Sequence, residues 1–325
     1  MVSDSPKREA WLALKAETAI DYATEHAMQP MPIATGIAPL DDRLNGGLPR
    51  GLVTVLAGEA GCGKSAMACV ATYNAAKSNA FPVYFSIEMP EQMVVSRMLA
   101  IHTAQSRAWD RARGVPENQL VPQVWWSTTR NVVRQLAGRM PRTVEEAEAY
   151  VAEHGSQDPV IRAWADFERT VWQRMAVVES VTDIDEVCDR TERLCEAGLR
   201  PLVVVDYLQM GCDGGEGSEY ERVTRAIGKL AALAKRWQIA VLCISGMRNI
   251  GRDERRETPT LSMLRSSGRI GFDAGVVLVL RRSESQDEGA SRTNVECHVV
   301  KSRVSPPTGQ DFVPLQFNGG MNMFE

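Results

Sequence analysis

The sequence predicts an α/β fold in which a mostly parallel, twisted sheet is flanked by helices and followed by antiparallel strands. Two observations support this fold class. From Ile33 onward, short apolar segments alternate with amphipathic segments of helical length, and such alternation is typical of parallel sheets whose strands are joined by helical crossovers. After Gly275 the helical segments end, and three strand-like segments follow one another at the spacing of a meander.

The individual elements follow from local patterns along the chain. The most apolar segment, residues 202–206, reads Leu-Val-Val-Val-Asp and is expected at the centre of the sheet, because a strand covered on both faces needs apolar side chains on both. The expected strands cover residues 51–57, 82–87, 175–179, 202–206, 239–245, 275–281, 294–301 and 312–317. The expected helices cover residues 66–73, 91–103, 184–196 and 219–237.

Two segments depart from this alternation. Residues 1–32 predict an N-terminal helix and linker arm, in which a helix over 8–28 carries a partial apolar stripe and ends before Pro30 and Pro32. This helix either packs on its own domain or docks on a neighbouring subunit. Residues 33–325 predict one large domain, interrupted at about 104–174 by a helical insertion.

The insertion is unusual in composition. Its first half is rich in arginine and its second half in acidic residues. It contains five of the seven tryptophans: Trp109, Trp125, Trp126, Trp164 and Trp172. Because tryptophan and arginine are enriched in interface hot spots, the segment is a candidate docking surface. The alternative is that these tryptophans form a small core within the insertion itself.

The bulk composition is that of a soluble globular protein, with 44% hydrophobic and 24% charged residues. No apolar run reaches the roughly 18 residues that a membrane-spanning helix needs, and residues 1–10 are too polar for a signal peptide. We therefore expect a cytoplasmic protein without membrane contact. The seven cysteines include no C-x-x-C pair and are expected to be reduced and mostly buried. With a net charge of −4, any binding to nucleic acid must depend on local basic patches.

A complete phosphate-binding loop follows the first expected strand. Residues 58–65 read G-E-A-G-C-G-K-S, which matches the pattern G-x-x-x-x-G-K-[ST] between a strand and a helix. The glycines let backbone N–H groups point at phosphate oxygens, Lys64 can reach the β- and γ-phosphates, and the Ser65 hydroxyl can bind Mg²⁺. We therefore expect ATP and Mg²⁺ as ligands. The expected nucleotide-binding residues are Gly58, Glu59, Ala60, Gly61, Cys62, Gly63, Lys64, Ser65 and Ala66.

Two acidic residues stand where expected strands end. Asp206 closes the strand 202–206 and is placed to hold Mg²⁺ beside Ser65. Glu88 follows the strand 82–87. Because the carboxyl ends of parallel strands face the ligand crevice, Glu88 is placed to orient and deprotonate the water that attacks the γ-phosphate. The alternative is a solvated glutamate without a catalytic role.

Several motifs in this order resemble those of the DnaB-type replicative DNA helicases. They are F-S-I-E-M-P at 85–90, V-D-Y-L-Q-M at 205–210 and L-R-S-S-G-R-I at 264–270, followed by Asp273-Ala274. The opening T-G-I-A-P-L-D at 35–41 and the closing F-N-G-G at 317–320 also fit. The resemblance covers the chain from Ala34 to its end, apart from the insertion. It implies a RecA-like P-loop NTPase motor that works as a hexameric ring on single-stranded DNA.

The resemblance also implies roles for single residues at the nucleotide. Glu88 matches the family's catalytic glutamate, and Asp206 matches its Walker B aspartate. Lys64 and Ser65 match its phosphate and Mg²⁺ residues.

A second group of residues is assigned through the resemblance alone. Lys301 and Arg303 resemble a K-x-R hairpin whose arginine acts in trans on the neighbouring subunit's γ-phosphate, although two cations at a hairpin tip are usually just solvated. Residues 265–269 resemble the loop that grips DNA through phosphate contacts. The DNA-binding residues expected from this loop are Arg265, Ser266, Gly268 and Arg269.

The chain departs from the family pattern at several positions. Gly246 follows Ser245 where the family has a glutamine that senses the state of the nucleotide. Ser266 stands where the family has a glutamate, and Arg269 adds a positive charge to the same loop. We also expect the family's N-terminal helical domain, which contacts primase in the relatives, to be absent, because only residues 1–32 precede the motor.

Two functions follow from these patterns. The first is an ATP-hydrolysing DNA helicase or translocase that acts at the subunit interfaces of a ring. The second is a RecA-, KaiC- or RadA-like ATPase that regulates DNA–protein assembly or recombination without unwinding, because residues 35–51 match that group nearly as well. The expected partners are single-stranded DNA, further copies of the chain, and a replication or loader protein bound through the insertion.

Overall fold

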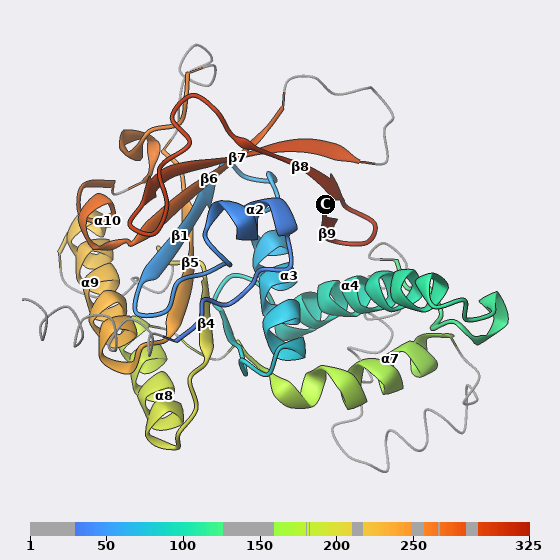
Figure 1. The fold of residues 1–325 in the computed structure, drawn as a ribbon. Coiled ribbons are helices and arrows are strands. Elements are labelled where there is room, and N and C mark those ends of the chain that lie inside the picture. The colour runs from blue at the N-terminus through green and yellow to red at the C-terminus, as the bar shows by residue number, and fades with distance from the viewer. Residues whose placement is uncertain are drawn as a thin grey trace, which may run out of the picture. The chain divides into compact units, whose positions relative to one another are not determined.

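Strands β1 to β6 pair in parallel in the order β3-β2-β4-β5-β1-β6 (Figure 1). Every side chain of β1 and β4 is buried, as expected for strands covered on both faces. The strands are β1 (Val53–Gly58), β2 (Val83–Ser86), β3 (Ala176–Val178), β4 (Leu202–Asp206), β5 (Ala240–Gly246) and β6 (Val276–Arg282).

The computed structural model describes residues 30–125, 159–179, 181, 183–209, 217–248, 257–265, 267–283 and 292–325.

Three antiparallel strands extend the sheet beyond β6. They are β7 (Thr293–Ser302), β8 (Val313–Asn318) and β9 (Met323–Phe324). The α/β fold class and the C-terminal antiparallel strands predicted from the sequence are confirmed. The two-residue strand β9 is an addition, because it is too short to leave an alternating pattern in the sequence.

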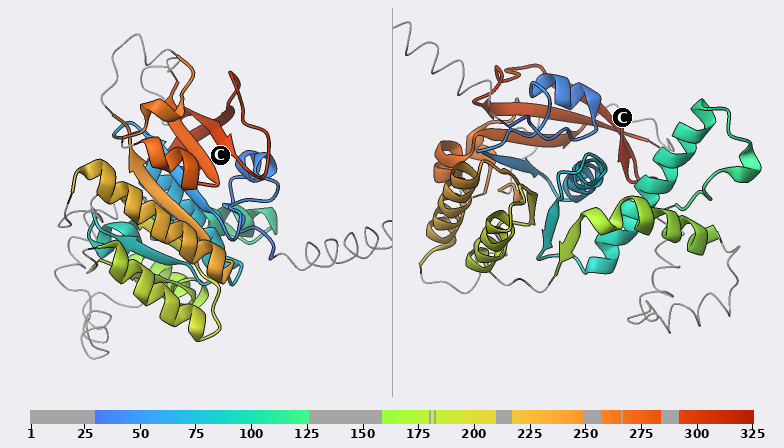
Figure 2. Two further views of the ribbon diagram at one scale, coloured as in Figure 1. Left: turned by 90° about the vertical axis from the view of Figure 1, so that its left-hand side faces the viewer. Right: turned by 60° about the horizontal axis from the view of Figure 1, so that its bottom comes forward.

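Helices cover both faces of the sheet (Figures 1 and 2). Alternation along β4 separates the two layers: Leu202 and Val204 pack with α3, α4 and α7, whereas Val203 and Val205 pack with α8, α9 and α10. The helices are α2 (Ala38–Arg43), α3 (Lys64–Lys77), α4 (Glu91–Ala112), α7 (Pro159–Thr170), α8 (Ile184–Glu196), α9 (Glu219–Trp237) and α10 (Ser267–Asp273). Short 3₁₀ turns lie at Glu117–Gln119, Trp172–Arg174 and Leu261–Met263.

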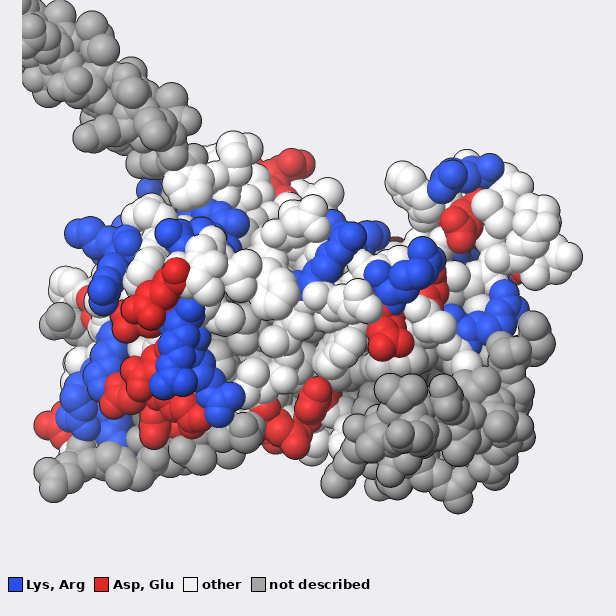
Figure 3. Space-filling model, turned by 90° about the horizontal axis from the view of Figure 1, so that it is seen from below, with Lys and Arg blue, Asp and Glu red and all other residues white. Residues whose placement is uncertain are grey.

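Local sequence explains where the outer helices begin. Ser218 and Glu221 form a capping box at the start of α9, and the side chain of Asp183 accepts from the backbone of Glu186 at the start of α8. Arg236 of α9 and Glu192 of α8 then form an ion pair of 2.9 Å. On this side of the molecule basic and acidic side chains are interspersed (Figure 3), so α8 and α9 do not present a patch of one charge sign.

Parts of the predicted insertion belong to the main core. Helix α4 continues to Ala112, past the predicted end at 103, and α7 packs against it. Phe167 of α7 is fully buried, which contributes about 1.5–3 kcal/mol, and its ring lies 5.6 Å from Trp164 and 6.1 Å from Trp172. Residues 126–158, which include Trp126, lie outside the described residues.

The predicted N-terminal helix also lies outside the described residues. The chain divides into Met1–Met31 and Pro32–Glu325, and the fold above is that of the second unit. Within the described part of the chain, no helix combines the length and the apolar character needed to cross a membrane.

Candidate active site

The phosphate-binding loop lies between β1 and α3, and its path requires glycine. Gly63 has φ +99° directly before Lys64, the first residue of α3. A Cβ atom at Gly63 would lie 2.8 Å from the ring of Phe324. A Cβ atom at Gly58 would lie 2.6 Å from the carbonyl oxygen of Leu280. A larger residue at either position would therefore push the loop away from its neighbours.

Cations hold the carbonyl side of this loop. The Lys64 ammonium donates to the carbonyl oxygens of Gly58 and Glu59, at 2.8 Å each. From β6, Arg282 donates to the carbonyl oxygen of Gly61 at 2.6 Å. The N-terminal end of α3, from Gly63 to Ala66, lines a cleft, and the positive end of a helix dipole in a cleft is the arrangement that binds phosphate.

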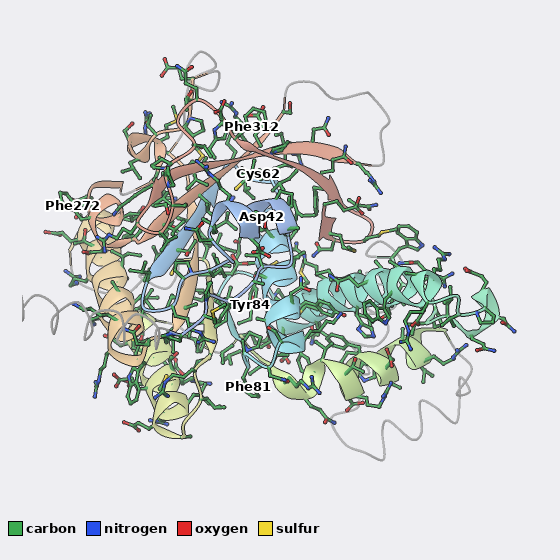
Figure 4. All side chains as sticks on the ribbon, viewed as in Figure 1. Asp42, Cys62, Phe81, Tyr84, Phe272 and Phe312 are labelled. Atoms are coloured by element: carbon green, nitrogen blue, oxygen red, sulfur yellow. The ribbon has the colours of Figure 1, made fainter. Side chains whose placement is uncertain are left out.

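Cys62, inside the loop, has its side chain turned into the protein (Figure 4). Burial raises the pKa of the Cys62 thiol, although the charge of Lys64 lowers it. The thiol therefore stays protonated and is a poor nucleophile at neutral pH.

A cleft of about 840 Å³ opens in front of the loop. Its volume is within the range of small-molecule sites. Among the described lining residues, the basic side chains outnumber the acidic Glu59 and Glu88. The basic lining residues are Lys64, Arg97, Arg248 and Arg265. The cleft is thus suited to a polyanion such as a nucleoside triphosphate.

Glu88 faces this cleft, as the sequence predicts. The backbone N–H groups of Ile87 and Glu88 both donate to the carbonyl oxygen of Asp206, at 2.7 and 3.2 Å. The end of β4 therefore fixes the backbone that carries Glu88, while its side chain is exposed to solvent. A carboxylate held in this way can accept a proton from a water molecule in the cleft.

Asp206 is fully buried at the end of β4. One carboxylate oxygen accepts a 2.5 Å hydrogen bond from the Tyr84 hydroxyl, whereas Oδ1 has no hydrogen-bond partner among the described residues. Burial raises the pKa of Asp206, while the hydrogen bond from Tyr84, the nearby Ser65 hydroxyl, which makes no hydrogen bond to Oδ1, and the charges of Arg97 and Lys64 lower it. A buried acceptor that lacks a donor fits a hydrated Mg²⁺, which prefers oxygen ligands and keeps several waters.

Gly246 lies on the cleft wall together with Arg265. A Cβ atom at Gly246 would lie 4.0 Å from Cδ of Arg265, so the arginine occupies the space beside the position where the family has glutamine. Arg265 also forms a 2.5 Å ion pair with Glu219 at the start of α9. Gln209 supports the backbone here: its amide donates to Ser245 at 2.9 Å and accepts from Gly246 at 3.3 Å.

The other residues of the predicted DNA-binding loop have different positions. Gly268 and Arg269 belong to the backbone of α10, and the Arg269 side chain is outside the described part of the structure, as is Ser266. Arg265 is therefore the member of the group whose side chain is placed, and it lies on the nucleotide cleft.

Lys301 and Arg303 lie at the carboxyl end of α10. The Lys301 ammonium donates to the carbonyl oxygens of Gly271, Phe272 and Ala274, at 2.6, 3.2 and 2.6 Å. Arg303 donates to the carbonyl oxygen of Phe272 at 2.7 Å. Neither residue is among the described residues that line the cleft of the same chain.

The sequence patterns did not predict several residues of the cleft. One of them is Arg97, which comes from the second turn of α4. The C-terminal hairpin adds Phe317, Gly319 and Asn322 to the cleft wall. The sequence signal for this hairpin is the F-N-G-G motif at 317–320, which the family resemblance includes without indicating a place in the cleft.

The fold and this site define a RecA-like P-loop nucleotide-binding domain. The chain belongs to the DnaB-like helicase C-terminal domain family, whose model matches residues 160–325. The KaiC ATPase family model matches residues 33–150.

Curated relatives agree with this assignment. Over 295 residues the chain is 27% identical to the replicative DNA helicase DnaB of Geobacillus stearothermophilus, which is 90% of this chain and 56% of that protein. It is 24% identical to the replicative DNA helicase DnaC of Bacillus subtilis, with the same shares covered. The chain thus spans little more than half the length of these curated relatives.

Two solved structures share the fold. One is an ATPase domain that superposes with a TM-score of 0.64 at 20% identity, covering 99% of both chains. The other is a DnaB-like replicative helicase, studied with its interactions with primase, which superposes with a TM-score of 0.65 at 18% identity and covers 94% of this chain and 65% of that one.

Proposed function

We propose that this chain is the ATP-hydrolysing motor of a DnaB-type DNA helicase, which forms a hexameric ring and moves on single-stranded DNA. The observation that carries the proposal is the position of Glu88, an exposed carboxylate on the same cleft as Lys64 and the phosphate-binding loop. Membership of the DnaB-like family supports the choice of motor within the larger class of P-loop proteins.

In this proposal each residue of the cleft has a defined task. Lys64 exchanges the carbonyl oxygens of its own loop for the β- and γ-phosphate oxygens of ATP. Ser65 and Asp206 would hold Mg²⁺, which when bound neutralises charge on the phosphate oxygens. Glu88 orients a water molecule and accepts its proton as the water oxygen bonds to the γ-phosphorus and the bond to the β–γ bridging oxygen breaks, which releases ADP and phosphate.

Arg303 is assigned to the neighbouring subunit's site. Its guanidinium donates to the end of α10 and is not among the described residues that line the cleft of its own chain, which supports a role across a subunit interface. Lys301 makes three bonds to the end of α10, so we assign it the task of fixing the hairpin that carries Arg303. A cation placed against the negative end of a helix is favourable.

DNA is assigned to the segment around the start of α10. Gly268 and Arg269 contact the phosphate backbone in this proposal, together with Ser266, and such contacts position a strand without reading its sequence. Arg265 connects this segment to the nucleotide, because its side chain lies on the cleft wall beside Gly246. DNA binding and the state of the nucleotide are then coupled through one arginine.

A second candidate function is a KaiC-like ATPase that regulates assembly without unwinding, and the match of residues 33–150 to the KaiC family favours it. The two functions are separated by measuring ATP hydrolysis with and without single-stranded DNA and then the separation of a forked duplex. A helicase gives DNA-stimulated hydrolysis and strand separation, and Lys64→Ala abolishes both. Hydrolysis that ignores DNA, with no strand separation, contradicts the helicase proposal and supports the alternative.

The insertion is proposed as the docking site for a replication or loader protein. Trp109 is 65% exposed and Trp125 is 40% exposed, and exposed tryptophans are frequent anchors of interfaces. The test is the double variant Trp109→Ala, Trp125→Ala, which removes these two side chains and leaves α4 and α7 in place. The variant should keep DNA-stimulated hydrolysis and lose capture of a purified loader or primase. Unchanged capture would exclude these two tryptophans as the docking site.

A further inference from the structure

Tyr84 places a hydroxyl group against the buried aspartate of the site. Its hydroxyl donates a 2.5 Å hydrogen bond to Oδ2 of Asp206, and both residues are fully buried. The register of the sheet explains the contact. Tyr84 of β2 is paired with Val204 of β4, so its side chain lies on the face of the sheet that also carries Val204 and Asp206. Asp206 is two residues farther along β4, and that diagonal is within the reach of an aromatic side chain.

Strand β2 therefore holds Asp206 at two points. The backbone N–H groups of Ile87 and Glu88 donate to its carbonyl oxygen, and the Tyr84 hydroxyl donates to its carboxylate. The carboxylate cannot turn about its bond to Cβ without breaking the bond from Tyr84. The strand that ends before Glu88 thus fixes both the main chain and the side chain of Asp206.

The bond from Tyr84 makes the two carboxylate oxygens unequal. Oδ2 is engaged, whereas Oδ1 is buried and has no hydrogen-bond partner among the described residues. The hydroxyl of Ser65, at the start of α3, lies near the same carboxylate. Because a buried acceptor is costly when unpaired, a cation bound by Oδ1 and the Ser65 hydroxyl would supply the missing partner.

We propose that Tyr84 is a positioning residue for Mg²⁺, whose hydroxyl fixes the Asp206 carboxylate so that Oδ1 stays available to the metal ion. Without this hydroxyl, Oδ2 becomes a second buried acceptor without a donor, and the carboxylate can turn toward Ser65. Two metal-binding groups would then bind each other. The inference rests on the proposed use of ATP with Mg²⁺. It adds that metal affinity depends on a residue that is not among the described residues lining the cleft.

The experiment measures the affinity of Mn²⁺, a spectroscopic substitute for Mg²⁺, for the full chain in complex with a non-hydrolysable imido analogue of ATP. Electron paramagnetic resonance quantifies the free Mn²⁺. Tyr84→Phe keeps the ring and removes the hydroxyl, so it should weaken Mn²⁺ binding about tenfold, at the lower end of the effect of residues that orient metal ligands. The Mg²⁺ concentration that half-saturates hydrolysis should rise by the same factor. Affinity for the analogue in EDTA should change less than about twofold.

Tyr73→Phe is the matched control, because it removes another hydroxyl from the same core. Tyr73 is buried, its hydroxyl lies 3.0 Å from Nδ1 of His102, and it is not among the described residues lining the cleft. This variant should lower the free energy of unfolding and leave the Mn²⁺ affinity equal to that of wild type. If Tyr84 served only the stability of the core, both variants would change the Mn²⁺ affinity alike.

A second comparison tests the contact itself and does not require Tyr84→Phe to fold alone. With the neutral amide of Asp206→Asn in place, the further change Tyr84→Phe leaves no buried charge without its donor. The Mn²⁺ affinity of the double variant should lie within about twofold of that of Asp206→Asn. A further tenfold loss would mean that the Tyr84 hydroxyl acts on a group other than the Asp206 carboxylate, which overturns the inference.

The remaining outcomes separate this inference from the proposed function. Wild-type Mn²⁺ affinity in folded Tyr84→Phe overturns the role of Tyr84 and leaves the nucleotide function intact. An equal loss of Mn²⁺ affinity in Tyr73→Phe also overturns it, because the loss would then follow from stability. If wild type binds neither the analogue nor Mn²⁺, the nucleotide function and the role of Tyr84 are rejected together.

Discussion

At the scale of the residue, Glu88 is expected to control hydrolysis without controlling binding. Its carboxylate lies on the cleft, whereas the loop that would hold the phosphates is bound by Lys64. Glu88→Gln keeps the shape and removes the base, so turnover should fall by roughly 10²-fold or more while ATP affinity stays unchanged. Steady-state hydrolysis and equilibrium binding measure the two effects separately.

Glu59→Gln is the matched control, because it removes the other acidic side chain among the described lining residues. If acidity in the cleft were all that mattered, both variants would lose the same activity. Wild-type turnover in Glu88→Gln would mean that a different carboxylate activates the water.

Residues of the site could be predicted where a contiguous pattern places them. Gly58 to Ser65 form one motif, and Glu88 and Asp206 stand at strand ends that any parallel sheet brings together. Arg97 and Asn322 could not be predicted in this way, since each reaches the cleft from an element far away in the sequence. The proximity of Arg265 to Gly246 could not be predicted either, because glycine has no side chain whose chemistry would indicate a neighbour.

At the scale of the element, His102 joins three helices. Its Nε2 lies 2.9 Å from Asp166 of α7, and its Nδ1 lies 3.0 Å from the Tyr73 hydroxyl of α3. A neutral ring that carries its proton on Nε2 satisfies both partners. Burial lowers the pKa of His102, as do the charges of Lys77 and Arg169, whereas Asp166 raises it. The folded protein therefore favours the neutral ring.

The free energy of unfolding should consequently depend on pH through His102. Because the pKa is lower in the folded state, this contribution is fully present above about pH 6.5 and is lost as the pH falls toward the folded pKa. His102→Gln should lower stability by about 1–3 kcal/mol at pH 7.5, since the buried Tyr73 hydroxyl loses its partner. In urea unfolding experiments, the free energy of unfolding should fall less between pH 7.5 and pH 5.5 for the variant than for wild type.

Asp166→Asn provides the control with the opposite sign. Removing the carboxylate takes away the group that raises the His102 pKa, so the decline should extend to lower pH than in wild type. If the free energy of unfolding changed with pH in the same way for wild type and both variants, His102 would have the same pKa in the folded and unfolded states.

The bounds of an element could be predicted where its own local sequence sets both of its ends. The capped amphipathic helices α8 and α9 were predicted with their observed bounds. Helix α4 was predicted too short, because its second half is polar on one face and becomes stable by packing on α7. Residues 265–269 were expected as a loop from the family resemblance, whereas α10 already begins at Ser267 and has its end stabilised by Lys301 from a distant strand.

At the scale of the whole molecule, we propose that a neighbouring subunit completes the active site. The cleft contains the phosphate-binding loop and Glu88, whereas Arg303 is bound to the end of α10, beside Phe272, which is 74% exposed (Figure 4). An exposed aromatic residue next to a cation is typical of a surface that meets another protein. A ring of subunits that places this surface against the neighbour's cleft would bring Arg303 to the phosphate-binding loop and would cover Phe272.

If each active site is shared between two subunits, a mixture of two inactive variants should regain activity. Arg303→Ala should bind ATP normally and hydrolyse it about 10³–10⁵-fold more slowly, the effect of an arginine finger in other phosphoryl-transfer systems. Lys64→Ala should be inactive because its phosphate-binding loop is defective. When the two proteins are mixed, some interfaces pair an intact loop with an intact arginine, so part of the activity should return. Arg292→Ala mixed with Lys64→Ala is the control for simple dilution, since Arg292 is paired with Glu325 and is not among the described residues that line the cleft. Failure to recover activity at any mixing ratio, with subunit exchange verified by mass measurement, would mean that hydrolysis is completed within one chain and that Arg303 serves only to hold α10.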